Sequence, residues 1–550
     1  MAHRKNNKII ILKCLFIGVF TPIGKGTFVK FSRGEKVQGT PTIGRAYSVA
    51  ITGIDAHIIS VEVDTSRGYP GFNIVGFPDS IVRESRDRVV SAISNSGIEA
   101  PSGKVTVNLA PASIKKIGAS FDLPIAVGIL NSLGKLPALP EKSIFIGELS
   151  LSGQVRHISG AISVALKAKE SGFTHLFLPQ SDAAEVASID GLTIIPLQNI
   201  RELIDLTFKP LSPQETPQDN ITPEVDMPDF SDVRGQTLAK EAAEIACAGG
   251  HNLLMIGPPG SGKSMIASRL SGILPPLSES EAIETTKIYS VAGMLPSRNG
   301  LMKTRPFRSP HHSASSAGIV GGGKNASPGE ITLAHNGVLF MDEFPEFDRE
   351  IKEVLRQPLE TDVVTISRAN ATITYPCSFM LVAAMNPCPC GNYQNPKKNC
   401  SCSPVEVKKY LARISAPLRE RIDLHVAMSP VEYGELADKT RPESSETIRA
   451  RVLKARSIQE KRYAGKSYTC NAKLPDGDLK EFCKRTQNAV ALLKDMYVKH
   501  NLSARSFARL LKVARTIADL DGAEIIHSAH VTAALRFRES DNFNFVLGAY

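Results

Sequence analysis

The sequence predicts an α/β protein with three domains and a linker. Residues 45–206 alternate short strands with amphipathic helices, which is typical of an α+β domain. Residues 230–430 alternate apolar strands with helical stretches, which indicates a largely parallel sheet. Residues 431–550 lack this strand pattern and are predicted to be helical. Residues 207–229 are rich in proline and acidic residues and poor in apolar ones, so we expect a linker there.

Residues 1–44 precede these domains and hold most of the excess positive charge. They contain eight Lys and Arg against one acid, in a chain whose formal net charge is +10. The run Ile9–Phe20 resembles the apolar core of a signal peptide, but Lys13 interrupts it and no small-residue cleavage pattern follows. It is also too short to span a bilayer. We expect a disordered or mis-started extension, no membrane segment, and a cytoplasmic, reducing compartment.

The first domain begins with short strands in which apolar and polar residues alternate. The stretches 48–54, 57–63 and 72–77 have this pattern. An amphipathic helix is predicted at 79–97, and a further strand at 104–111. This order of elements predicts an α+β domain that ends near Leu206.

The second domain contains a phosphate-binding loop. The stretch GPPGSGKS matches G-x-x-x-x-G-K-[ST] and lies between the apolar strand 252–256 and a helical stretch. Its glycines let the backbone aim N–H groups at phosphate oxygens, Lys263 reaches the β and γ phosphates, and the Ser264 hydroxyl binds Mg²⁺. The predicted ATP-binding residues are Gly257, Pro258, Pro259, Gly260, Ser261, Gly262, Lys263 and Ser264.

Two further strands of this domain end in polar residues. The strand 337–342 delivers Asp342, which is followed by Glu343, and the strand 379–386 ends at Asn386. Asp342 is predicted to hold Mg²⁺ through water, and Glu343 to orient or deprotonate the attacking water. Asn386 is placed to touch the γ-phosphate or that water. These residues predict an ATPase that uses Mg²⁺.

Four of the nine cysteines lie in the stretch MNPCPCGNYQNPKKNCSC, with the spacing C-x-C-x9-C-x-C. A disulfide staple, a redox or nucleophilic site, free thiols and a metal site are the alternatives. The loop has little apolar content of its own and needs a cross-link to stay ordered. We favour Zn²⁺ on four thiolates, although C-x-C is tighter than the usual C-x₂-C. The predicted ligands, in an insert at 388–402, are Cys388, Cys390, Cys400 and Cys402.

The clearest helix of the third domain covers 503–522. Ser503 is a plausible N-cap, and Gly522 lies just past the end. One face of this helix is apolar, as in an amphipathic helix. The residues of that face are Phe507, Leu510, Leu511, Ala514, Ile517 and Ala518.

Three phrases of the sequence carry a family resemblance. Residues 305–323, 328–347 and 413–426 resemble those of the ComM/YifB family, in the magnesium-chelatase-like branch of the AAA+ ATPases, and the likeness extends from Arg45 onward. The resemblance implies a homo-oligomeric, hexameric ring motor on single-stranded or branched DNA. It further implies a branch-migration helicase that aids strand integration in natural transformation.

The family resemblance also implies roles for two arginines. Arg421 matches the arginine finger that reaches the γ-phosphate bound by the next subunit, and Arg505 matches the sensor arginine of the helical lid. The phrase PLRERID departs from the family pattern by carrying Arg419 and Glu420, which leaves Arg419 as a rival finger.

A segment that the family uses as a pore-facing insert contains several polar candidates. His311 and His312 suggest a metal site, but the resemblance favours an insert without metal. Arg305, Arg308 and Lys324 lie near a GGG turn and are the candidates for nucleic-acid contacts. A solvated charge cluster is the alternative.

The first domain resembles the protease domain of Lon, in which a Ser–Lys pair does the chemistry. Aligned helices place Asp122 at the nucleophile position and Ser163 at the lysine position. Neither residue type can serve in that role, so we expect a non-proteolytic scaffold or a DNA-binding collar. For the whole chain, a magnesium-chelatase-type ATPase subunit and an ATP-gated regulatory scaffold remain the rivals to the DNA motor.

Overall fold

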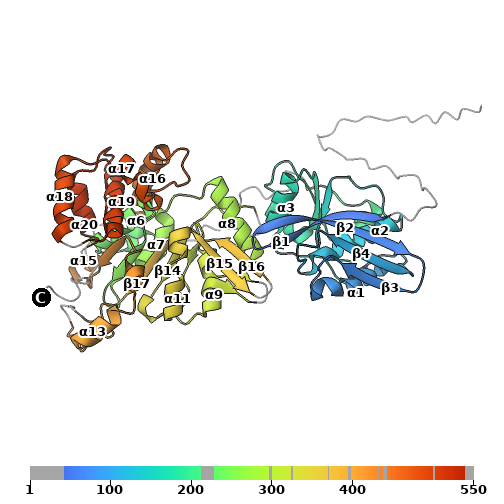
Figure 1. The fold of residues 1–550 in the computed structure, drawn as a ribbon, viewed down its shortest axis with the longest axis horizontal. Helices are drawn as coiled ribbons and strands as arrows, with labels where there is room; N and C mark the ends of the chain where they lie inside the picture. Colours follow the sequence, from blue (N-terminus) through green and yellow to red (C-terminus); the bar gives the residue numbers. More distant parts are fainter. Residues whose placement is uncertain are drawn as a thin grey trace, which may run out of the picture.

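The computed structural model contains two bodies, an N-terminal domain and a larger body that unites the sheet domain with the C-terminal helices (Figure 1). The residues that it describes are 43–211, 228–295, 300–323, 326–368, 371–393, 395, 398–431, 433–437, 442–499 and 502–538. The predictions for residues 1–42, for most of the linker and for Lys324 lie outside these residues. No described helix is long and apolar enough to cross a membrane.

The N-terminal domain is built on a four-stranded sheet in the order β1-β2-β4-β3. Its strands are β1 (Gly44–Thr52), β2 (Asp55–Ser66), β3 (Gly71–Val75) and β4 (Lys104–Ala110), and only the β3–β4 pair is parallel. The other elements are α1 (Ser80–Asn95), α2 (Asp122–Ser132), β5 (Ser143–Phe145), β6 (Glu148–Leu149), β7 (Val155–Arg156), α3 (Ala161–Glu170), β8 (His175–Pro179), α4 (Ala183–Val186), β9 (Thr193–Leu197) and α5 (Arg201–Asp205). Strands β5, β8 and β9 form a second, parallel sheet. Apolar side chains of α2 pack on β1 and β2, which explains why the alternating strand pattern has one buried face.

The second domain is built on a five-stranded sheet in the order β11-β14-β17-β10-β18, and every pairing in it is parallel. The strands are β10 (Leu253–Ile256), β11 (Phe307–Arg308), β14 (Val338–Met341), β17 (Met380–Met385) and β18 (Leu424–Ala427). Strands β10, β14 and β17 are buried along their whole length, which is why they read as continuous apolar runs in the sequence. The predicted α/β fold class is confirmed.

Helices cover both faces of this sheet (Figure 1). Two hairpins, which form separate two-stranded sheets, occur between successive strands of the chain. The helices are α6 (Thr237–Gly249), α7 (Lys263–Ile273), α8 (Glu279–Val291), α9 (Ser316–Val320), α10 (Glu330–Leu333), α11 (Arg349–Val354), α12 (Pro358–Thr361), α13 (Pro404–Leu411), α14 (Ala416–Arg419) and α15 (Tyr433–Ala437). The hairpins are β12 (Gly321–Gly322) with β13 (Ser327–Pro328), and β15 (Val363–Arg368) with β16 (Ala371–Pro376).

The C-terminal helices share one apolar core with the sheet domain. They are α16 (Ser445–Arg462), α17 (Leu479–Phe482), α18 (Gln487–Lys499), α19 (Ala504–Leu520) and α20 (Ser528–Leu535). Helix α16 packs on α6 and α7, and α19 packs on α6. His251, just before β10, lies 2.8 Å from the Thr516 hydroxyl on α19. The helical lid is therefore anchored at the amino-terminal edge of the sheet.

The two bodies meet where α3 packs against α8. Glu185, on α4, accepts a hydrogen bond from the Ile162 backbone N–H at 3.0 Å and another from the Ser290 hydroxyl on α8. Burial raises the pKa of the Glu185 carboxyl. A buried polar contact of this kind requires a fixed orientation of α8 against the N-terminal domain.

Candidate functional site: a nucleotide site divided between two edges of the sheet

The loop between β10 and α7 surrounds the Lys263 side chain. Its ammonium donates hydrogen bonds to the carbonyls of Gly257 at 2.7 Å and Pro258 at 3.0 Å, and lies 3.3 Å from the Asn386 side-chain oxygen. Burial lowers the pKa of Lys263, while Asp342 and Glu343 act in the opposite direction. Gly262 has φ +91°, a conformation that lets α7 start with its N–H groups directed at the loop. The loop therefore encloses the ammonium group of Lys263. Phosphate oxygens can replace the two carbonyls as its hydrogen-bond acceptors.

A pair of oxygen ligands lies beside this loop. The Ser264 hydroxyl, at the start of α7, donates a hydrogen bond of 2.7 Å to a carboxylate oxygen of Asp342, at the end of β14. Mg²⁺ prefers oxygen ligands and keeps several waters, so one hydroxyl and one carboxylate suit it. Because β10, β14 and β17 are parallel neighbours, their carboxyl ends bring Lys263, Asp342 and Asn386 together at one edge. ATP with Mg²⁺ fits the residues at this edge.

Glu343 contacts a histidine that sequence reasoning did not pair with it. The His312 Nδ1 atom lies 3.2 Å from a carboxylate oxygen of Glu343, whose backbone has φ +50°. The rings of His311 and His312 lie 4.2 Å apart. Thirty residues separate His312 from Glu343 in the sequence, and no spacing pattern predicted their contact. The contact joins the carboxylate at the end of β14 to the segment that follows β11.

The two predicted arginines lie together, at the opposite edge of the sheet from Lys263. Arg421 precedes β18, and Glu360 of α12 is bound both by Arg421 and, at 3.1 Å, by Arg505 of α19. Arg421 is only 4% exposed, and burial lowers its pKa. Strand β18 is parallel to β10. Arg421 precedes β18 and therefore lies at the amino-terminal edge of the sheet, whereas the phosphate loop follows β10 and lies at the carboxyl edge. These arginines therefore lie on the side of the sheet away from the phosphate loop of their own chain.

The four clustered cysteines converge after Asn386. All four sulfur atoms lie within 4.8 Å of one another, and the separations among Cys388, Cys390 and Cys400 are 3.4, 3.5 and 3.7 Å. A disulfide requires about 2.05 Å, and the described cysteines are free. Four thiolates at about 2.3 Å from Zn²⁺ would be about 3.8 Å apart, the edge of a tetrahedron. The donor set and its spacing therefore fit zinc.

The predicted nucleic-acid cations of the insert are engaged within the chain. Arg305 forms an ion pair with Glu281 at 2.8 Å and donates to the Asn336 carbonyl at 2.7 Å. Arg308 is bound by both oxygens of Glu330, at 2.6 and 2.7 Å. Each guanidinium group thus has a carboxylate partner within the chain, which a nucleic-acid phosphate would have to displace, and contact with a nucleic acid stays a prediction.

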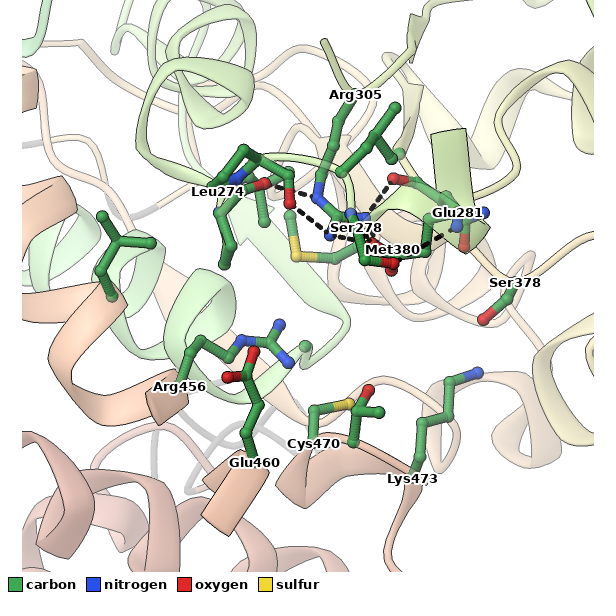
Figure 2. Close-up of a pocket in the computed structure, with 18 of the residues that line it drawn as sticks. Leu274, Ser278, Glu281, Arg305, Ser378, Met380, Arg456, Glu460, Cys470 and Lys473 are labelled. Atoms are coloured by element: carbon green, nitrogen blue, oxygen red, sulfur yellow. Dashed lines mark hydrogen bonds and ion pairs between the residues drawn. The ribbon is translucent and has the colours of Figure 1, made fainter. Parts of the chain in front are cut away.

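Arg305 also lines a cavity of about 540 Å³ between the amino-terminal edge of the sheet and α16. Figure 2 shows Arg305 and Glu281 on one wall and Arg456 and Glu460 of α16 on the other. Gly337 and Met380, at the starts of β14 and β17, complete its floor. The cavity thus lies at the edge of the sheet opposite to the phosphate loop and is not part of the nucleotide site.

In the N-terminal domain, Asp122 is the buried centre of a polar cluster. It is fully buried and accepts hydrogen bonds from the Ser85 hydroxyl at 2.5 Å, from Arg88 at 2.6 and 3.0 Å, and from the Leu149 backbone N–H at 3.2 Å. Ser163 is also buried, and its hydroxyl has no hydrogen-bond partner among the described residues. Both carboxylate oxygens of Asp122 are therefore committed to holding α1 and β6 against α2.

Comparison with known proteins finds three family models that match parts of the chain, and relatives that match over nearly their whole length. Residues 229–436 match the family model described as "Magnesium chelatase, subunit ChlI", residues 61–182 match "Subunit ChlI of Mg-chelatase", and residues 442–538 match its C-terminal model. The protein YifB of Escherichia coli is 43% identical over 90% of this chain and 96% of its own length. The competence protein ComM of Haemophilus influenzae is 42% identical over the same shares. The chain belongs to the YifB/ComM family.

This family has magnesium-chelatase-type domains and is AAA+ ATPase-like, in agreement with the parallel sheet and the phosphate loop. A Lon protease of Salinispora arenicola is 24% identical over 33% of the chain and 25% of its own length. Lon protease 2 of Bacillus subtilis is 25% identical over 31% of the chain. The family therefore combines an ATPase-like body with a part that is related to Lon.

Proposed function

We propose that the protein is an ATP-hydrolysing ring motor that acts on DNA and performs ComM-like branch migration in recombination or transformation. The observation that carries this proposal is the division of the ATP site. Lys263 and Asp342 lie at the carboxyl edge of the sheet, and Arg421 and Arg505 belong to the opposite edge. Copies that meet head to tail would join the two halves, and closure of that arrangement gives a ring, proposed to be a hexamer.

Each residue of the proposed site has a distinct task in hydrolysis. The loop from Gly257 to Ser264 binds the phosphates, and Ser264 with Asp342 holds Mg²⁺, which neutralises charge on the phosphates. Glu343 accepts the proton of the attacking water, and Asn386 orients that water or the γ-phosphate. Arg421 and Arg505 of the neighbouring copy stabilise the negative charge of the transition state. Arg421 must leave Glu360 to do so.

The DNA substrate is supported by the relatives and by the N-terminal domain. The relative named as a competence protein is matched over 96% of its length, which makes a shared task plausible for the whole chain. The Lon-related part does not match the Ser–Lys pair, because the position aligned with its nucleophile is Asp122, which is buried and saturated with hydrogen bonds. ATP turnover would therefore be coupled to DNA and not to peptide cleavage.

Zn²⁺ bound by Cys388, Cys390, Cys400 and Cys402 is a further part of the proposal. We expect about one zinc per chain in protein purified without chelators, because four thiolates fill a tetrahedral site. Replacing Cys388 and Cys390 by serine should release the metal. Elemental analysis checks both statements, with the buried Cys247, which is remote from the cluster, replaced by alanine as the control. Metal-free wild-type protein would contradict the zinc site.

A magnesium-chelatase-type ATPase subunit is the second candidate, favoured by the descriptions of the three matching family models. It would use ATP to drive insertion of Mg²⁺ into a porphyrin together with a chelatase partner. An ATP-gated regulatory scaffold is the third. The match to the competence protein ComM over 96% of its length favours the DNA motor over both.

The proposed function is tested by migration of a synthetic four-way DNA junction. We expect ATP-dependent conversion of the junction to products, a loss of this activity as salt rises, and no ATP-dependent degradation of casein. The variant Glu343→Gln serves as the control that binds ATP without hydrolysing it. If DNA changes neither the ATPase rate nor the assembly state while protoporphyrin with a chelatase partner does, the chelatase candidate replaces this proposal.

A further inference from the structure

The cysteine knuckle, residues 388–402, lies directly against the phosphate loop. Gly391 is buried, and a Cβ atom at this position would lie 2.6 Å from Pro259 Cδ and 2.9 Å from Pro259 Cγ. The same Cβ would be 3.9 Å from the side chain of Asn386. Since the backbone of Gly391 touches the ring of Pro259, the knuckle and the phosphate loop cannot move independently at this point.

The turn that carries Gly391 is held by the cluster itself. Gly391 has φ +77°, and its N–H donates to the Cys388 carbonyl at 3.0 Å. The Tyr393 N–H lies 3.3 Å from the Cys388 sulfur, and Cys390 is the residue immediately before Gly391. The shape of this turn therefore depends on where the sulfur atoms of Cys388 and Cys390 are fixed.

One short segment thus contacts the nucleotide site twice. Asn386 reaches the Lys263 ammonium at 3.3 Å, and Gly391 covers Pro259. Cys388, which lies between these two contacts, is fully buried in the core that lies under β10, β14 and β17. Cys400 and Cys402 lie at the other end of the loop in the sequence, just before α13. The sulfur atoms of the four cysteines bring the two ends of this loop together.

We infer that the metal-bound knuckle is a positioning element of the nucleotide site, with Gly391 as its point of contact, and that metal and nucleotide bind cooperatively. Without metal the loop gains many conformations, Pro259 and Asn386 lose their support, and the binding-competent fraction of the phosphate loop falls. The apparent dissociation constant of the nucleotide rises by the inverse of that fraction. By thermodynamic linkage, bound nucleotide must raise the affinity of the protein for the metal by the same factor.

This inference rests on the proposed zinc site, but it is independent of DNA and of the ring. Coupling between two sites usually amounts to about 5- to 150-fold in affinity. We expect about tenfold here, because one glycine contact and one side chain join the sites. The effect is predicted on binding, not on the chemical step, so a nonhydrolysable ATP analogue reports it.

The experiment measures the dissociation constant of a fluorescent nonhydrolysable ATP analogue on the full chain, with zinc content determined for every sample. Cys400→Ser with Cys402→Ser removes metal without altering the residues that touch the phosphate loop. We expect about tenfold weaker nucleotide binding and an unchanged circular dichroism spectrum. In wild-type protein, saturating analogue should slow zinc transfer to a chromogenic chelator and lower the equilibrium transfer by the same factor.

The glycine contact has its own variant and a matched control. Gly391→Ala should keep its zinc and lose nucleotide affinity, because the added methyl group overlaps Pro259. Gly465→Ala is the control, since Gly465 has φ +81° and open space around the position of a Cβ. Equal nucleotide affinity with and without zinc, or an unchanged affinity in Gly391→Ala, would overturn the inference. Absence of zinc from wild-type protein would instead overturn the zinc site, and the coupling with it.

Discussion

Arg421→Ala is expected to lower ATP turnover by about 10³- to 10⁵-fold, the usual contribution of an arginine finger. Its affinity for nucleotide should change little, because the residue precedes β18 while the phosphate loop follows β10. The fold should survive, because the partner Glu360 has a side chain that is 42% exposed and water can solvate it. The measurement is steady-state ATPase activity, with nucleotide affinity and assembly state determined in parallel.

Arg419→Ala is the matched control for this variant. Arg419 lies two residues earlier, at the end of α14, and is half-buried. If its loss abolishes turnover while Arg421→Ala remains active, Arg419 is the finger and the pairing of Arg421 with Glu360 is structural. Arg421→Lys should recover little, because lysine lacks the planar donor pair that spans two phosphate oxygens.

Glu343→Gln is the second variant with a large expected effect. Loss of a general base costs about 10²- to 10⁴-fold, and the amide keeps the size and hydrogen-bonding capacity of the side chain. Because the Asp342 carboxylate and the Ser264 hydroxyl remain, Mg²⁺ and ATP should still bind. The measurements are the rate of phosphate release and the affinity for ATP.

Lys263→Ala separates binding from chemistry. The Lys263 ammonium lies inside the phosphate loop, so its removal should abolish ATP binding itself. Glu343→Gln should in contrast bind ATP normally and assemble with it. Near-normal hydrolysis by Glu343→Gln would reject the assignment of Glu343 as base and direct attention to another acid at the end of β14.

The half of the site at the carboxyl edge could be predicted from sequence for a physical reason. A phosphate loop is one continuous stretch with fixed glycine positions, and buried parallel strands read as apolar runs that end in polar residues. Asp342 and Asn386 each come directly after such a run, Lys263 follows the loop after β10, and parallel pairing brings all three to one edge. The α/β class follows from the same runs.

The contacts of Arg421, Arg505 and Glu343 could not be predicted, because they join distant segments. Glu360 binds Arg421 and Arg505, which lie 61 and 145 residues away in the chain. No periodicity or motif marks Glu360. The contact of His312 with Glu343 is of the same kind. Such pairs depend on how distant segments pack against one another, which local sequence patterns do not encode.

The carboxylate partners of the arginines in the insert were also not predicted from the sequence. Arg305 and Arg308 were candidates for nucleic-acid contacts because they lie near glycines, yet Glu281 and Glu330 bind them. Both acids are close enough in sequence to have been considered as partners, at 24 and 22 residues' distance. An arginine that is half-buried in a folded domain is more often paired than presented to solvent.

The central claim is that each ATP site is completed by two copies of the chain, and mixing two inactive variants tests it most directly. Glu343→Gln retains Arg421, and Arg421→Ala retains Glu343. In rings assembled from equal amounts, about a quarter of the sites would combine an intact base with an intact arginine. We predict recovery of ATPase activity to about a quarter of the wild-type rate. A mixture that stays as inactive as its separate components, although mixed rings are shown to form, would contradict the shared site.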